Sequence, residues 1–196
     1  MALQVNTAAP LFAFDAYDPK SKSVKNIALA QFKGKWVVLF FYPADFTFVC
    51  PTELEDLAKR QSDFDALGCQ IIGVSTDTVY SHKMWLESEE LLKPVQFLLA
   101  ADRNGAVSKA YGVYDEASGN ASRGAFIIDP DGKLMAYEVN AEPVGRCAAE
   151  LVRKLKAFKF VRENKGQVCP ASWETGHPTL KPGVEIAGKV AKALRK

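Results

Sequence analysis

Runs of apolar residues separated by short polar segments predict strands and helices that alternate along the chain. The segment Trp36–Tyr42 is apolar at every position, which is typical of a strand covered on both faces, and Pro43 ends it. After Cys50, apolar residues recur at helical spacing up to Gly68, a plausible C-cap. The apolar run Cys69–Ser75 then predicts a second strand. Together these segments indicate a strand–helix–strand unit.

The second half of the chain continues this alternation. Helical spacing predicts helices, and short apolar runs predict strands, over these ranges: helices 81–90, 106–111 and 146–162, and strands 96–99, 124–129 and 134–139. The last two strands flank Pro130–Lys133, whose Asp-Gly step is typical of a hairpin turn. They are therefore expected to pair antiparallel. The apolar stripe of the 146–162 segment predicts a long amphipathic helix packed on the sheet.

These elements indicate an α/β fold in which a central mixed sheet is flanked by helices. The main domain is expected to span residues 1–163. Glycines and prolines interrupt the chain repeatedly between residues 164 and 182, which argues against regular structure there. Residues 164–196 are therefore expected to form a C-terminal arm that lies over the domain or over a neighbouring subunit.

Composition and charge exclude several classes of function. The chain has 196 residues, of which 48% are hydrophobic, and this fits one compact domain with an extension. Its 25 basic and 23 acidic residues leave a net charge of +2, which gives no electrostatic footprint for nucleic acid. There is neither a leader pattern nor a run of the roughly 20 apolar residues that a membrane helix needs. We expect a cytoplasmic protein with no nucleic-acid or membrane partner.

The four cysteines, Cys50, Cys69, Cys147 and Cys169, are too sparse for a disulfide scaffold, and no two of them form a C-x-x-C pair. Only two histidines are present, far apart in the sequence, which argues against structural zinc. No metal or cofactor is predicted. Cys69 opens an apolar strand and Cys147 lies beside an apolar helical stripe, so both are expected to be packing residues.

Cys50 lies between a buried strand and the predicted start of a helix. The unpaired N–H groups and the dipole at a helix N-terminus favour an anion, and therefore the thiolate over the thiol. The alternative is a small buried hydrophobe. The nucleophile is favoured by the Thr47 hydroxyl, a candidate hydrogen-bond partner for a thiolate or a substrate oxygen, and by Pro43 and Pro51, which restrict the backbone.

Three charged residues are candidates to support a reactive thiolate. Glu53 follows Cys50 closely enough to cap the helix or to orient the site. Arg123 directly precedes an apolar strand, where a guanidinium would stabilise a thiolate and the charge that builds as a peroxide O–O bond breaks. The alternative for Arg123 is a surface residue. Arg146 is a candidate for the electrostatics of the site or for an interface, or is simply solvated.

These residues together resemble the typical two-cysteine peroxiredoxins, and most closely their bacterial alkyl hydroperoxide reductase C type. The resemblance spans nearly the whole chain and rests on Phe41–Glu53, on Arg123 before the 126–129 strand, on Val144–Arg146 and on Val168–Pro170. The first motif is highly specific, whereas the other three would be weak alone.

The resemblance implies a thioredoxin-like fold and a thiol-dependent peroxidase acting on hydrogen peroxide and organic hydroperoxides. It implies that Cys50 is the peroxidatic cysteine, that Pro43, Thr47 and Arg123 line its pocket, and that Cys169 is the resolving cysteine. Cys50 would become a sulfenic acid and then form a disulfide with Cys169 of the other subunit. The implied partners are a second copy in a homodimer, further copies in a decamer, and a disulfide reductase, either a dedicated flavoprotein or a thioredoxin.

Two other functions are alternatives to this one. A thiol–disulfide reductase would carry a second cysteine three positions after Cys50, where this chain has Glu53. An oligomeric holdase chaperone or scaffold is the remaining alternative, and it is compatible with catalysis. In the peroxidase, disulfide geometry requires Cα atoms within roughly 7 Å, so a cysteine in the first turn of a helix must leave it before bonding. Local unfolding is therefore expected in the cycle.

Peroxiredoxins that excess peroxide inactivates resemble one another in a Gly-Gly-Leu-Gly loop and a C-terminal helix bearing Tyr-Phe, and this chain has neither. We therefore expect the Cys50 sulfenic acid to be resolved before it is oxidised further to sulfinic acid. Mass spectrometry after turnover with modest peroxide should find Cys50 almost free of sulfinate. Predominant sulfinate under these conditions would contradict the expectation.

Overall fold

The computed structural model describes residues 3–194, which fall into two compact units, one ending at residue 148 and the other beginning at residue 149. The predicted boundary between domain and arm, at residues 163 and 164, stays a prediction. Residues 195 and 196 of the predicted arm lie outside the described residues. No helix in the described part of the chain is long and apolar enough to cross a membrane.

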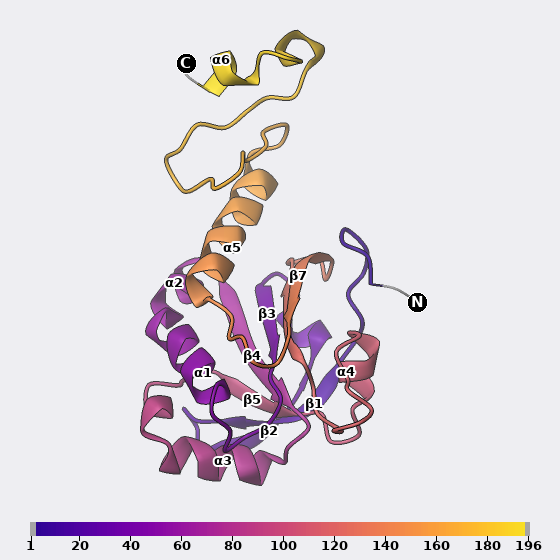
Figure 1. Ribbon diagram of the computed structural model, residues 1–196, viewed down its shortest axis with the longest axis vertical. Helices are drawn as coiled ribbons and strands as arrows, with labels where there is room; N and C mark the ends of the chain where they lie inside the picture. The colour runs from indigo at the N-terminus through magenta and orange to yellow at the C-terminus, as the bar shows by residue number, and fades with distance from the viewer. Residues whose placement is uncertain (1–2, 195–196) are drawn as a thin grey trace. The chain divides into compact units, whose positions relative to one another are not determined.

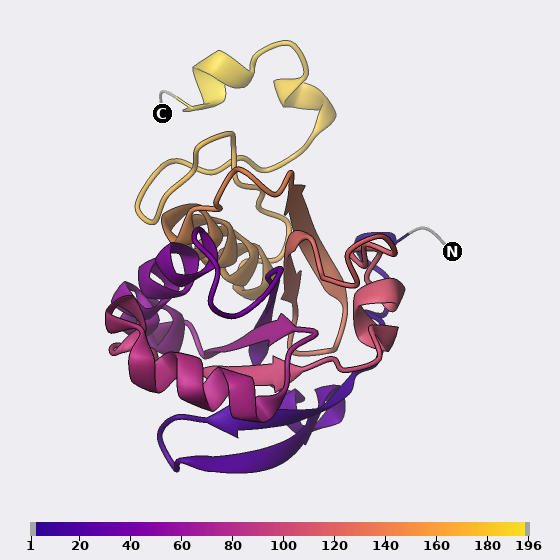
Figure 2. The same ribbon diagram turned by 60° about the horizontal axis from the view of Figure 1, so that its bottom comes forward.

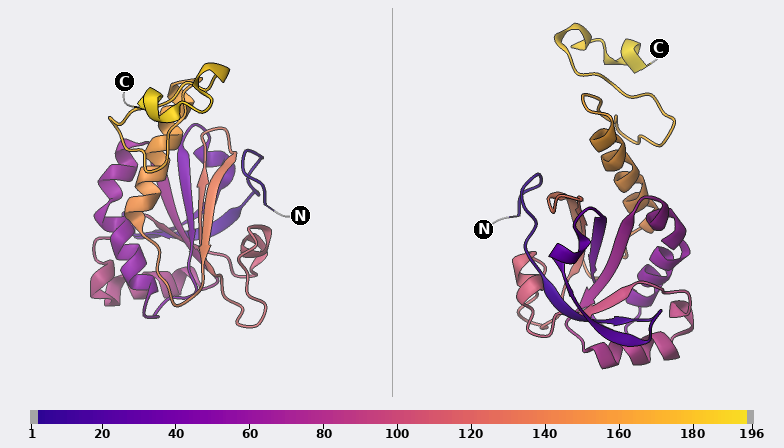
Figure 3. Two further views of the ribbon diagram at one scale, coloured as in Figure 1. Left: turned by 45° about the horizontal axis from the view of Figure 1, so that its top comes forward. Right: turned by 180° about the vertical axis from the view of Figure 1, so that it is seen from behind.

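Over the described residues, the first unit contains a seven-stranded sheet of order β2-β1-β5-β4-β3-β6-β7 (Figure 1). In chain order the strands are β1 (Ala13–Asp18), β2 (Ser23–Ala28), β3 (Trp36–Phe41), β4 (Cys69–Ser75), β5 (Leu98–Ala101), β6 (Arg123–Ile128) and β7 (Leu134–Asn140). Strands β3, β4 and β5 pair parallel, and all the other pairs are antiparallel. The β1–β2 hairpin forms one edge of the sheet and β7 forms the other (Figure 3).

Helices cover both faces of this sheet. They are α1 (Cys50–Lys59), α2 (Gln61–Ala66), α3 (Val79–Ser88) and α4 (Ala106–Ala110), with short 3-10 helices η1 (Leu29–Phe32) and η2 (Glu90–Leu92). Figure 2 shows α1 and α2 on one side of the sheet and α4 on the other. The helix expected to run from Cys50 to Gly68 is two helices, because Arg60 between them leaves helical geometry with ψ of 13°.

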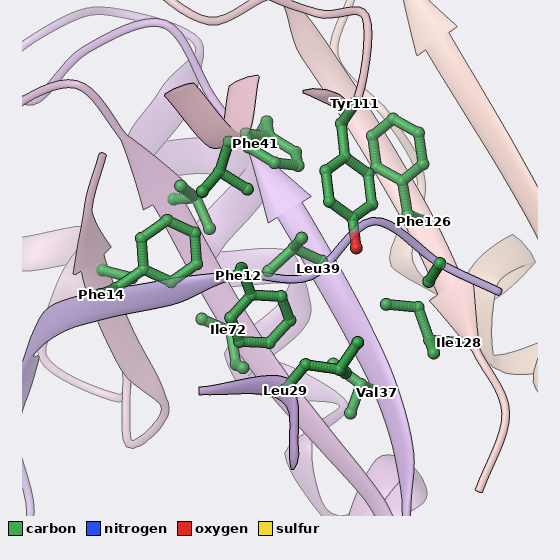
Figure 4. Packing of buried hydrophobic residues seen from close by; sticks show 14 of the residues in the cluster. Phe12, Phe14, Leu29, Val37, Leu39, Phe41, Ile72, Tyr111, Phe126 and Ile128 are labelled. Carbon is green, nitrogen blue, oxygen red and sulfur yellow. The ribbon is translucent and has the colours of Figure 1, made fainter. Parts of the chain in front are cut away.

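The central strand β3 is buried at every residue, as its uninterrupted apolar run predicts. Val37, Leu39 and Phe41 point into one hydrophobic core, with aromatic residues from other elements around them (Figure 4). Among these, Phe126 lies edge-on to Tyr111 with ring centroids 4.8 Å apart. Since β3 is held from both faces and by strands on both sides, the chain leaves its carboxyl end from a fixed point.

The predicted mixed α/β fold is confirmed. Strands β3, β4, β6 and β7 lie within a residue of their predicted ends, and β6 and β7 pair antiparallel around Gly132, whose φ of 81° suits glycine alone. Strand β5 lies two residues later than expected. The β1–β2 hairpin was not predicted. Strand β2 is an edge strand, exposed at its first four residues, so it carries little apolar signal.

The second unit contains nearly all of α5 (Ala148–Glu163) and the chain that follows it. Helix α5 confirms the predicted long helix. Within that chain Val168 and Leu180 form an isolated antiparallel bridge. Two short helices, η3 (Val184–Ile186) and α6 (Val190–Leu194), come after it.

Candidate active site

Cys50 is the first residue of α1, and its side chain is completely buried. The loop between β3 and α1 delivers it there. The carbonyl of Val49 accepts the backbone N–H groups of Thr52 and Glu53, at 3.1 and 3.2 Å, so the helix starts directly at the cysteine. Pro51 follows in the first turn, where its missing N–H leaves no bond unmade. The sulfur therefore lies at the positive end of a helix, as predicted.

Arg123 is the first residue of β6, and only 3% of it is exposed. Its Nη1 donates to Cys50 Sγ at 3.4 Å and to Glu53 Oε2 at 2.8 Å, while its Nε donates to the carbonyl of Glu142 at 2.6 Å. Burial lowers the pKa of Arg123, but its bonds to Cys50 and Glu53 outweigh burial, and the net pKa is raised. The guanidinium is a permanent positive charge beside the sulfur, so the surface alternative for Arg123 is wrong.

Glu53 is a buried carboxylate shared by two arginines. Besides the bond from Arg123, it receives Arg146 N and Nε on Oε1, both at 2.8 Å, and Arg146 Nη2 on Oε2 at 3.1 Å. Arg146 also lies over the ring of Phe40, with its Cζ 3.4 Å from the centroid. Burial lowers the pKa of Arg146, and the charge of Glu53 opposes this. Arg146 is therefore part of the site and not a solvated residue.

The Val-Gly-Arg segment lets the backbone approach α1 closely. A Cβ at Gly145 would lie 3.2 Å from Val49 Cγ1 and 3.5 Å from Glu53 Cγ. Glycine therefore allows the N–H of Arg146 to reach the carboxylate of Glu53.

Thr47 and Pro43 lie on the loop that carries Cys50. The hydroxyl of Thr47 donates to the carbonyl of Ala44 at 2.7 Å, so its proton is used and its lone pairs remain as acceptors. Pro43 is buried and lines a cavity of about 100 Å³ together with Ser122 and Glu142. Ser122 directly precedes Arg123, and the carbonyl of Glu142 accepts the bond from Arg123 Nε. Thr47 is therefore oriented as a hydrogen-bond acceptor on this loop.

A second buried polar network, which sequence reasoning missed, holds this loop. Asp45 accepts the hydroxyl of Tyr42 at 2.8 Å, and its other oxygen lies 2.8 Å from His82 Nδ1. The backbone N–H of Asp45 donates to Asp77 at 2.8 Å. Burial and the charge of Asp45 raise the pKa of Tyr42. His82 is fully buried, and it ties α3 to the loop.

Cys169 belongs to the second unit, where its Sγ donates to the carbonyl of Ala157 on α5 at 3.8 Å. Burial raises the pKa of this thiol, and the charge of Arg153 lowers it in part. The pairing of Cys169 with Cys50 stays a prediction.

The other two cysteines differ from each other. Cys69 is buried, as expected, and burial raises its pKa strongly, which makes it an inert thiol. The expectation that Cys147 is a packing residue is wrong, because its side chain is exposed at the turn before α5. Among residues 3–194, no group of three or more His, Cys, Asp or Glu side chains is arranged to hold a metal ion.

Comparison with known proteins identifies the family. Residues 5–137 match the family model described as AhpC/TSA. The chain belongs to the AhpC/TSA family. Proteins named alkyl hydroperoxide reductase C from Staphylococcus epidermidis and Staphylococcus aureus are each 45% identical to it over 179 residues, which cover 91% of this chain and 95% of each relative.

Solved structures of family members agree with this assignment. The crystal structure of Enterococcus faecalis AhpC has a TM-score of 0.80 and 42% identity, covering 85% of this chain and 98% of that one. The reduced 2-Cys peroxiredoxin of Plasmodium vivax has a TM-score of 0.91 and 32% identity, covering 97% of this chain and all of that one. The predicted resemblance to two-cysteine peroxiredoxins and the predicted thioredoxin-like fold are both confirmed.

Replacing Glu53 by Gln should lower the free energy of unfolding by about 3–5 kcal/mol, because two buried guanidinium groups lose their shared counter-charge. Urea unfolding followed by tryptophan fluorescence at fixed protein concentration measures this. Glu55→Gln is the matched control on the same helix. Glu55 pairs only with the largely exposed Lys59, so the loss there should stay below about 1 kcal/mol. Equal losses in the two variants would contradict the assignment.

Proposed function

We propose that this member of the AhpC/TSA family is a thiol-dependent peroxidase that reduces hydroperoxides at Cys50. The observation that carries the proposal is the buried Sγ at the start of α1 with Arg123 Nη1 at 3.4 Å. Reactive cysteines occupy such electropositive positions, whereas inert ones lie in apolar surroundings, as Cys69 does. The names of the staphylococcal relatives, alkyl hydroperoxide reductase C, support the same substrate class.

The buried charges beside Cys50 favour a negatively charged group next to them. Arg123 and Arg146 contribute two positive charges to the buried cluster, and Glu53 contributes one negative charge. Among these three groups one positive charge is left over, and it attracts a negative charge at the neighbouring sulfur. In a buried site with low dielectric, an unmatched charge costs far more than in water. Glu53 therefore orients Arg123 and offsets one of the two positive charges. The charge of the second guanidinium remains to attract a negatively charged sulfur.

In the first step the Cys50 thiolate attacks the terminal oxygen of the hydroperoxide. An S–O bond forms while the O–O bond breaks, and the proton of the attacked oxygen passes to the leaving oxygen, which departs as alcohol or water. The sulfur is left as a sulfenate, which takes a proton from water to become the sulfenic acid. Arg123 stabilises the charge that builds on the oxygens as they separate. Thr47, whose own proton is directed to Ala44, accepts a hydrogen bond from the O–H of the hydroperoxide and so orients it for attack.

In the second step the Cys169 thiol attacks the Cys50 sulfenic acid. The S–S bond forms, and the sulfenic oxygen leaves as water with the thiol proton. We assign this step to Cys169 of a second subunit in a homodimer, with decamers of these dimers. A disulfide reductase, either a flavoprotein or a thioredoxin, then supplies two electrons. Because Cys50 is buried in a helical turn, α1 must open at its start before the disulfide forms.

The finer assignments stay predictions: the cytoplasmic location, the choice between hydrogen peroxide and organic hydroperoxides, and a coexisting holdase activity. A Cys50→Ser protein separates the holdase activity from catalysis, because it has no peroxidatic sulfur. It should lose peroxidase turnover and, if the holdase activity exists, still suppress the aggregation of unfolded chains.

Arg123→Met should lower kcat/KM for hydroperoxide by about 10²-fold or more, since the leaving oxygen and the thiolate lose the same cation. Peroxide-consumption assays with a saturating reductant measure the loss. Arg103→Met is the control, because Arg103 is exposed and donates to the carbonyl of Thr76, away from Cys50. It should stay within about twofold of the parent. A parental rate in the Arg123→Met protein would refute the role of this guanidinium.

One equivalent of peroxide should convert the reduced parent to a covalently linked dimer on a non-reducing gel. Cys50→Ser and Cys169→Ser should remain monomers, because each lacks one half of the disulfide. Cys147→Ser should still form the dimer, and this control excludes linkage through the exposed Cys147. A linked dimer in the Cys169→Ser protein would assign resolution to another thiol.

A further inference from the structure

Arg153 on α5 makes three hydrogen bonds that tie the helix to the chain following it. Its Nε and Nη2 donate to the two oxygens of Glu150 at 2.7 and 2.8 Å, a bidentate pair one turn earlier on the same helix. Its Nη1 donates to the carbonyl of Trp173 at 3.1 Å. Glu150 thus fixes the plane of the guanidinium so that the remaining nitrogen reaches the backbone of residue 173.

The segment held by Arg153, residues 168–180, is called here the resolving-cysteine loop. Val168 and Leu180 close its base through two backbone bonds of 2.9 and 3.1 Å, and the side chains of Gln167 and Thr179 bond beside them. Figure 1 shows the chain turning back after α5 before it continues to η3 and α6. The loop is therefore a closed unit of its own and not an extended strand of chain.

Trp173 fixes the far part of this loop. Its ring packs on Phe160 of α5 with centroids 4.8 Å apart, and its Nε1 donates to the carbonyl of His177 at 3.0 Å. Because Arg153 holds the backbone of the same residue, Trp173 is attached to α5 through its side chain and its main chain together.

Cys169 lies near the base of the resolving-cysteine loop with its sulfur directed at α5, where it donates to the carbonyl of Ala157. The thiol proton of Cys169 is therefore already used in a hydrogen bond to the helix backbone. To form a disulfide it must approach another cysteine until the Cα atoms are within roughly 7 Å, and it must give up the bond to Ala157. Each contact that holds the loop on α5 therefore adds to the free energy needed to release Cys169.

We propose that Arg153 is a positioning residue for the resolving step. Arg153 latches the resolving-cysteine loop onto α5, and it thereby limits the rate at which Cys169 leaves the helix to attack the Cys50 sulfenic acid. This proposal rests on the function proposed above for Cys169. The latch requires no additional reactant. It changes only the rate at which the Cys169 thiol and the Cys50 sulfenic acid condense to a disulfide and water.

Arg153 acts on Cys169 in two ways that oppose each other, and a pair of variants separates them. Its hydrogen bonds restrain the loop, whereas its positive charge favours the thiolate and lowers the pKa of Cys169, which burial raises. Lysine keeps the charge but lacks the planar fork that bonds Glu150 and Trp173 together. Methionine removes both the charge and the fork.

The first experiment measures alkylation of Cys169 against pH in a Cys50→Ser background, with the Cys169 peptide quantified by mass spectrometry. The plateau rate at high pH reports how often the loop opens, and the midpoint reports thiolate formation. Arg153→Lys should raise the plateau at least about threefold and leave the midpoint unchanged. Arg153→Met should raise the plateau similarly and move the midpoint to higher pH.

The second experiment follows disulfide formation in proteins that retain both cysteines, by rapid quenching after one equivalent of hydrogen peroxide. Arg153→Lys should form the Cys50–Cys169 disulfide at least about threefold faster than the parent. Lys159→Met, which removes a positive charge from the same helix and an ion pair with Glu163 only, should match the parent in both experiments.

Plateau rates within twofold of the parent in both Arg153 variants would overturn the proposal. A raised plateau without faster disulfide formation would also overturn it, since the latch would then not limit resolution. Failure of the proposed function has a different signature, because the parent itself would then yield no Cys50–Cys169 peptide. Alkylation of Cys169 would still measure the latch in that case.

Discussion

The structure around Cys50 depends on one carboxylate, that of Glu53, which is shared by two buried guanidinium groups. The bonds it accepts come from residues 70 and 93 positions later in the chain, so three separate segments must converge for any of these charges to be buried. Removing water from two arginines is costly, and the paired carboxylate, the carbonyl of Glu142 and the ring of Phe40 offset that cost. The same pairing points Arg123 at the sulfur. The same contacts thus pair the buried charges and place a cation beside the Cys50 sulfur.

The convergence is possible because β3 is fixed on all sides. The strand ends at a constant place, and the loop after it is bound by Tyr42 at its start and by Asp45 in its middle. Phe46, next in sequence, has a φ of 57°, a strained value for a bulky residue that the surrounding bonds maintain. A loop held in this way places the first turn of α1 accurately while remaining free of regular structure. That combination suits the role proposed for Cys50, which is first to meet the substrate and then to leave the helix.

Sequence patterns predicted the parts of this arrangement that are encoded locally. The unbroken apolar run of β3, the Asp-Gly step before Lys133 and the position of Cys50 at a helix start are each visible within about ten residues. The ion pairs of Glu53 could not be predicted from the sequence, because no local pattern links a glutamate to arginines in β6 and before α5. Asp45 and His82, which lie 37 positions apart, form a contact of the same kind. Cys147 was misjudged because a helical stripe does not show where the helix begins.

The two cysteines are held by the same device at very different strengths. Beside Cys50, an arginine is oriented by a glutamate, and the side chains of Arg123 and Glu53 are only 3% and 1% exposed. Beside Cys169, Arg153 is oriented by Glu150, and those side chains are 28% and 40% exposed. Exposed pairs contribute little to stability, whereas breaking a buried pair costs several kcal/mol. The pair beside Cys169 is therefore the weaker of the two. This difference agrees with the role proposed for Cys169, because a resolving thiol must leave its place in every cycle.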